Sequence, residues 1–116
     1  MPTESESSRP LQPAALHILL ALGRGERHGY ALIGDVAALS EGAIRLGPGT
    51  LYGTIKRLLA DGLIEEAEER PDPELDDQRR RYYRLTTAGA KVLEAQRHTW
   101  REFVDAISRI TGVEHA

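Results

Sequence analysis

Residues 46–64 read LGPGTLYGTIKRLLADGLI, and this stretch decides the fold. A Gly-Pro pair followed by a hydroxyl residue is typical of a helix start. Gly62 is placed to end the helix, while Gly53 lies inside it at a cost of about 1 kcal/mol relative to alanine. We predict one helix whose apolar stripe is formed by Leu51, Ile55, Leu58 and Leu59.

Two helical patterns precede this stretch. The second runs from His28 to about Leu39. The first opens near Pro13, since proline is tolerated in the first turn of a helix. With residues 46–64, these patterns predict three successive helices. The apolar face of the first helix is expected to hold Leu16, Leu19, Leu20 and Gly23.

An extended segment and a long helix follow. Residues 63–85 contain two short extended runs around a Pro- and Asp-rich segment, which is typical of a β-hairpin with a long tip. Thr86 or Thr87 provides the N-cap of the last helix, which continues to about Ile110. The predicted fold class is therefore mainly α with a small β-hairpin: a winged helix-turn-helix plus one long C-terminal dimerisation helix.

Length and composition fit one small domain. The chain has 116 residues and no cysteine, which excludes disulfides and thiolate metal sites. Its longest apolar run is far shorter than the roughly 20 residues of a membrane span. We expect a cytoplasmic protein with a disordered tail at residues 1–10, a winged-helix domain at 11–86, a dimerisation helix at 87–111 and a tail at 112–116.

The formal net charge of −3 does not argue against DNA binding, because the acidic residues are concentrated in one segment. Residues 65–77 hold eight acidic side chains and one arginine, a charge of −7. The other residues hold 14 basic and 10 acidic groups, a charge of +4. The outer part of the hairpin is therefore expected to be acidic, and the rest of the domain basic.

The third helix is the candidate DNA-recognition element. In a winged helix-turn-helix this helix enters a DNA major groove, and the hairpin rests on the flanking backbone. From Arg45 to Arg57 the chain has three basic residues and no acidic one, which favours DNA over an ordinary solvated surface helix. The candidate contacts are Thr50, Tyr52, Thr54, Lys56 and Arg57.

A second basic cluster, Arg79, Arg80 and Arg81, lies in the returning run of the hairpin. Arginine side chains match phosphate oxygens well, so these residues are candidate contacts to the DNA backbone. Alternatively, they pair with acidic residues across the hairpin. We expect both uses.

The last helix carries an apolar stripe with alternating spacings of three and four, as at coiled-coil a and d positions. This pattern predicts a dimerisation helix, although packing of the whole stripe within one monomer is an alternative. Trp100 and Phe103 are the only tryptophan and phenylalanine of the chain, and aromatic side chains dominate interfaces. An apolar pocket for an aromatic ligand is the other interpretation of Trp100. The stripe comprises Leu93, Gln96, Trp100, Phe103, Ile107 and Ile110.

No catalytic or cofactor-binding pattern is present in the sequence. The four histidines are scattered without ligand spacing. The Gly-rich segments match neither the dinucleotide-binding fingerprint nor the phosphate loop. We expect no enzyme activity, no cofactor and no metal.

Several spaced blocks resemble PadR-type transcriptional regulators, and the resemblance covers about residues 11–110. It implies a homodimeric winged-helix repressor of the short subfamily, which has a single C-terminal dimerisation helix and binds a pseudo-palindromic operator. The matching blocks are His28-Gly29-Tyr30, Gly49-Thr50-Leu51-Tyr52, Arg57-Leu58, Gly62-Leu63-Ile64, Arg81-Tyr82-Tyr83-Arg84-Leu85-Thr86 and Gly89.

The resemblance also implies roles for particular residues. Thr50, Tyr52, Lys56 and Arg57 would contact DNA, and the hairpin arginines would hold its backbone. In similar short members, apolar aromatic effectors lie between the terminal helices and relieve repression, a role that Trp100 would take here.

Two positions depart from the family pattern, and two other functions remain open. Gly53 stands where proline is usual, and Ala31 stands where an acidic residue is usual. A winged-helix module that binds proteins without touching DNA is one alternative function. A small-molecule-binding protein that uses the groove of the terminal helix is the other.

Overall fold

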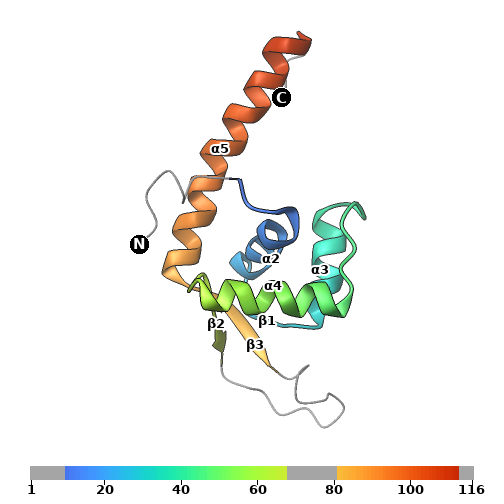
Figure 1. Ribbon diagram of the computed structural model, residues 1–116, viewed down its shortest axis with the longest axis vertical. Helices are drawn as coiled ribbons and strands as arrows, with labels where there is room; N and C mark the ends of the chain where they lie inside the picture. Colours follow the sequence, from blue (N-terminus) through green and yellow to red (C-terminus); the bar gives the residue numbers. More distant parts are fainter. Residues whose placement is uncertain (1–9, 68–80, 113–116) are drawn as a thin grey trace.

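Three helices pack around one apolar core in the computed structural model, which describes residues 10–67 and 81–112 (Figure 1). They are α2 (Pro13–Gly23), α3 (Ala31–Leu39) and α4 (Pro48–Ala60). The three predicted helices are confirmed, including the stripe on α4. Most of both predicted tails lies outside the described residues. The core side chains from the helices are Ile18, Leu19, Leu22, Leu32, Val36, Leu51, Ile55 and Leu58.

The second helix begins three residues later than predicted. His28 lies in strand β1 (Arg27–His28), and the backbone nitrogen of Ala31 donates a hydrogen bond of 3.2 Å to its Nδ1. The imidazole therefore satisfies one of the first free N–H groups of α3 instead of belonging to the helix. A strand of two residues has no periodicity of its own, so the sequence pattern gave no sign of it.

The paired strands of the predicted hairpin are confirmed, and β1 extends them to a three-stranded antiparallel sheet; the predicted long tip lies outside the described residues. Strands β2 (Ile64–Ala67) and β3 (Tyr82–Leu85) pair in register from Ile64 opposite Leu85 to Ala67 opposite Tyr82. The strand order is β1-β3-β2, so β3 is central. Its Tyr83 is buried in the core, and burial raises the pKa of the phenol.

The junction between the hairpin and the last helix, α5 (Thr87–Thr111), is closed by one side chain. Thr86 Oγ1 accepts a hydrogen bond of 3.0 Å from the Gly89 nitrogen, which confirms the predicted N-cap. The same hydroxyl donates to the carbonyl oxygen of Gly62 at 2.7 Å. Gly62 follows α4 with a φ of +74°, as the predicted helix stop requires. The two hydrogen bonds of the Thr86 hydroxyl thus link the start of α5 to the end of α4.

Helix α5 extends well beyond the other elements in Figure 1. It has 25 residues and ends at Gly112, whose φ is +72°. At 1.5 Å per residue a helix of this length spans on the order of 37 Å. No helix in the two described ranges is both long and apolar enough to cross a membrane.

Candidate DNA interface and effector groove

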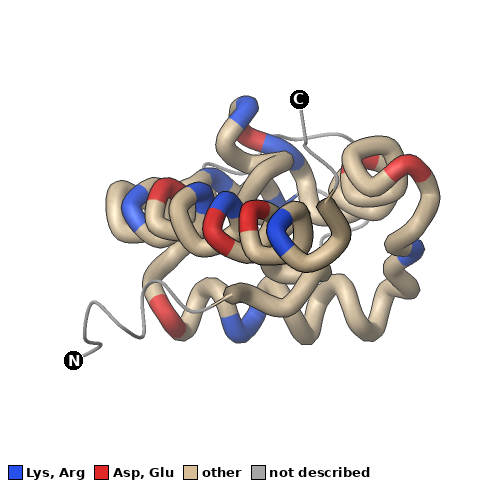
Figure 2. Tube along the Cα trace, turned by 90° about the horizontal axis from the view of Figure 1, so that it is seen from above, with Lys and Arg blue, Asp and Glu red and all other residues tan. Residues whose placement is uncertain are grey.

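The outward side of α4 is basic. Thr50, Lys56 and Arg57 are exposed on it. Gly49 and Gly53 have no side chain to cover the helix backbone, and a Cβ added at either position would meet no atom within 4 Å. In Figure 2, α4 runs along the lower edge of the molecule, with acidic colour confined to the region of its C-terminal end. The helix therefore offers a cationic face whose backbone another molecule could approach closely.

The cations around this face have no partner in the part of the chain that the structure describes. Within residues 10–67 and 81–112, neither Arg45, Lys56 nor Arg57 has a hydrogen-bond or ion-pair partner. Cations that the fold leaves unpaired can interact with an external anion without first breaking an internal contact. Two of these cations, Lys56 and Arg57, are among the candidate DNA contacts predicted from the sequence.

Thr54 corrects the predicted set of contacts. Its side chain is 3% exposed, and its Oγ1 donates a hydrogen bond of 2.8 Å to the carbonyl oxygen of Thr50. It points into the core side of α4 together with Ile55 and Leu58. Thr54 therefore cannot reach a DNA base from this position.

Tyr52 is half-buried and packs at the edge of the core. A Cβ placed on Gly29 would lie 3.0 Å from Tyr52 Cε1 and 3.2 Å from Tyr83 Cε2. The ring of Tyr52 thus closes over the turn that leads into α3, and a side chain at Gly29 would require the two tyrosine rings to shift by a few tenths of an ångström. This packing brings the sequence block that contains Gly29 next to the block that contains Tyr52.

The arginines of the described hairpin strands are paired with carboxylates. Arg84 Nε donates a hydrogen bond of 2.8 Å to Glu65, and its Nη1 lies 3.6 Å from Glu26. Arg81 Nη1 lies 3.7 Å from Glu66. The bond to Glu65 raises the pKa of Arg84. The charges of these arginines are thus balanced by carboxylates, as the alternative of pairing across the hairpin predicted. The other two expected contacts, Arg79 and Arg80, lie outside the described residues.

Helix α5 has two distinct halves. Its first half lies on the winged-helix domain, where Gln96 is 1% exposed and Leu93 and Trp100 are partly buried. Its second half exposes the rest of the predicted stripe: Phe103 is 56% and Ile107 45% exposed. Val104 and Ile110 are also exposed. The stripe therefore packs partly within the monomer and leaves an apolar surface near the C-terminal end.

A groove of about 510 Å³ lies between α2 and the first half of α5. This position corrects the face predicted for the first helix: Leu16, Leu20 and Gly23 line the groove, whereas Leu19 enters the core. Across from them lie Leu93 and Trp100 of α5. The walls are mostly apolar, and the charged residues at its rim, Glu94 and Arg97, form an ion pair of 2.6 Å.

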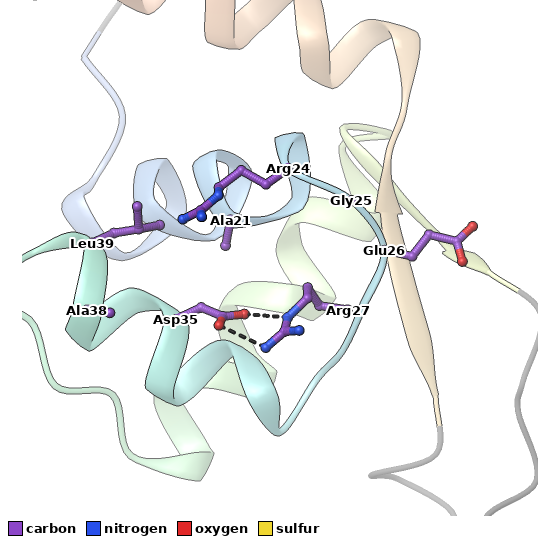
Figure 3. A pocket seen from close by; sticks show the side chains of 8 residues that line it. All are labelled: Ala21, Arg24, Gly25, Glu26, Arg27, Asp35, Ala38 and Leu39. Carbon is purple, nitrogen blue, oxygen red and sulfur yellow. Dashed lines mark hydrogen bonds and ion pairs between the residues drawn. The ribbon is translucent and has the colours of Figure 1, made fainter.

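A second pocket, of about 340 Å³, opens between α2, β1 and α3 (Figure 3). Arg27 and Asp35 form a two-pronged pair in it, with distances of 2.7 Å and 2.9 Å. This contact raises the pKa of Arg27 and joins β1 to α3. Figure 3 shows Glu26 pointing away from this pair, whereas the Arg24 side chain extends back along α2 over the pocket. The pair has a structural role.

No group of three or more metal-ligating side chains occurs in the part of the chain that the structure describes.

A basic third helix, a hairpin beside it and a protruding apolar helix define a winged helix-turn-helix protein. Residues 18–95 match the transcriptional regulator PadR-like family. The chain belongs to this family of transcriptional regulators, as the resemblance implied. The family and the characterised relatives are regulators and not enzymes.

Individual relatives agree with this assignment. The chain is 42% identical over 96 residues to the transcriptional regulator Rv3488 of Mycobacterium tuberculosis, covering 81% of this chain and 83% of that protein. It is 38% identical over 86 residues to an uncharacterised 37.1 kDa protein in transposon TN4556 of Streptomyces fradiae, covering 74% of this chain but only 22% of that protein. A PadR-like transcription factor from Bacteroides fragilis superposes with a TM-score of 0.67 at 26% identity, covering 83% and 87% of the two chains.

Proposed function

We propose that this regulator is a homodimeric repressor that binds a pseudo-palindromic operator with α4 of each subunit. The observation that carries the proposal is a set of cations on and beside the exposed face of α4, Arg45, Lys56 and Arg57, which have no partner among the described residues. In this proposal Thr50 and Arg57, which are exposed on α4, contact base edges, and the remaining cations contact phosphates. We expect it to act in the cytoplasm.

Dimerisation completes this proposal. The exposed side chains Phe103, Ile107 and Ile110 form an apolar surface on the protruding half of α5. A second copy is the occupant that suits this heptad-spaced surface, because two such helices bury each other's stripes. Two linked recognition helices then read two half-sites, about one helical turn apart.

Changing Lys56 and Arg57 to alanine should weaken operator binding by about 1–3 kcal/mol for each base contact that the substitutions remove. For each phosphate contact that they remove, the slope of log K against log salt should also fall by about 0.9. Both effects are measured by fluorescence anisotropy on DNA from upstream of the protein's own gene, titrated at several salt concentrations.

The matched control for this experiment removes two exposed cations outside α4, Arg24 and Lys91, which likewise have no partner within residues 10–67 and 81–112. This control should bind with nearly wild-type affinity. Equal weakening in both double variants would contradict a specific role for α4. Absence of any DNA binding at low salt would favour the alternative, a winged-helix module that binds an acidic protein.

The groove beside Trp100 supports a second element of the function: release from DNA by a planar, apolar effector. Its apolar walls and paired rim charges suit an uncharged aromatic molecule. Because Trp100 is the only tryptophan, its fluorescence reports binding directly. We expect saturable quenching by a planar probe such as naphthalene and a parallel loss of operator affinity.

Two alanines on α5 give a matched test of where the probe binds. Ala90 lines the groove, whereas Ala88 is exposed and does not. Ala90→Leu should fill part of the groove and weaken the quenching, and Ala88→Leu should leave it unchanged. Quenching that is the same in both variants would place the probe elsewhere.

A further inference from the structure

Helix α5 leaves the winged-helix domain at a buried polar contact. Its side chains face α2 as far as Gln96 and Trp100, and from Phe103 onward the apolar side chains Phe103 and Ile107 are exposed. The residue at this point is Gln96, one of the two buried polar side chains identified among the described residues. Burying a polar side chain in an apolar stripe costs free energy of folding unless hydrogen bonds compensate for the lost contacts with water.

The amide of Gln96 joins two segments that are far apart in the sequence. Its Oε1 accepts a hydrogen bond of 2.9 Å from the backbone nitrogen of Leu11, in the segment that enters α2. The same oxygen accepts one of 3.1 Å from Trp100 Nε1, one turn further along α5. One acceptor thus holds the entry to α2 and the indole of Trp100 in a fixed arrangement, and at 1% exposure water cannot easily replace it.

We infer that Gln96 is a positioning residue that fixes the angle at which α5 leaves the domain, and thereby the separation of the two recognition helices in the dimer. This inference rests on the proposed homodimeric DNA binding. The protruding halves of two α5 helices define the dimer axis. Any rotation of a domain about the Gln96 contact therefore displaces its α4 relative to that of the partner, and half-site spacing is read through this distance.

The position of this contact also connects it to the proposed effector. Gln96 and Trp100 both line the groove between α2 and α5. A ligand that turns the indole of Trp100 would break the bond to Gln96 and free the domain to rotate. Without ligand, this contact would fix the half-site spacing that the dimer prefers, and with ligand that preference would be weakened.

The test uses Gln96→Leu in the full chain, with DNA duplexes selected from a random pool by the wild-type protein. Duplexes with the selected half-site spacing are compared with duplexes whose spacing is one or two base pairs longer or shorter. We expect wild-type protein to discriminate between spacings by about tenfold or more, and Gln96→Leu to lose most of this discrimination, since two hydrogen bonds lose their acceptor. Affinity for each isolated half-site should be unchanged.

Gln12→Leu is the matched control, because Gln12 is exposed and its side chain makes no capping bond. Trp100→Phe removes one of the two donors and should give a partial loss of discrimination, which keeps the test decisive if Gln96→Leu does not fold. Spacing discrimination as strong as that of the wild type, in a folded Gln96→Leu variant or in Trp100→Phe, would overturn the inference. Failure of the wild-type protein to select any duplex would instead contradict the proposed function itself.

Discussion

Gly89→Ala should lower the free energy of unfolding by about 3 kcal/mol, near the upper end of what overpacking costs. A Cβ on Gly89 would overlap the carbonyl oxygen of Leu63 and would lie 2.8 Å from Leu85 Cδ1. The obstacle is backbone, and that carbonyl already accepts a hydrogen bond of 3.1 Å from the Thr86 nitrogen. The first turn of α5 must therefore move away from the α4–β2 turn, at the expense of the capping contacts.

Gly53→Ala is the matched control for this prediction. Gly53 also lies inside a helix, but nothing lies within 4 Å of its added Cβ. The same chemical change should here raise the free energy of unfolding by about 0.5–1 kcal/mol, because alanine has the higher helix propensity. Urea unfolding followed by circular dichroism measures both variants, and a Gly89→Ala protein as stable as wild type would refute the close contact.

Replacing Phe103 and Ile107 by glutamate should convert the protein to a monomer. Both side chains are exposed on the monomer, so the substitutions leave the core of the winged-helix domain intact. In a dimer they would place four carboxylates in an apolar interface, where unpaired charges are strongly disfavoured. Because a monomer holds only one half-site at a time, operator affinity should fall by about a hundredfold or more.

Light scattering at micromolar concentration measures the oligomeric state, and circular dichroism shows whether the helices are retained. Arg101→Glu is the control: it introduces a carboxylate at an exposed position of α5 outside the apolar stripe, and it should remain dimeric. A double glutamate variant that stays dimeric and keeps its operator affinity would show that α5 is not the dimerisation surface.

The features predicted correctly are those that local chemistry determines. A glycine after a helical pattern specified the end of α4 at Gly62, and a threonine before the last pattern specified the cap at Thr86. The apolar period identified Leu51, Ile55 and Leu58 as core residues. Such signals lie within a few residues of the structure they determine.

The features missed depend on contacts between distant residues. Strand β1 exists because Arg27 and His28 pair with β3, more than fifty residues further along the chain. The period of α5 showed that Gln96 and Phe103 share a stripe, but not that one faces Leu11 and the other faces outward. Thr54 was misplaced because a threonine suits both a DNA contact and a hydrogen bond to its own helix.

The double use of the Thr86 hydroxyl limits how this protein can be recombined with its relatives. It bonds to Gly62 and Gly89 at once, so the end of α4 and the start of α5 form one structural joint. A chimera that exchanges α4 between two regulators should therefore take residues 62–64 and 86–89 from the same parent. Cutting between these segments would combine a new α4, the proposed DNA-recognition helix, with a mismatched support for α5, the proposed dimerisation helix.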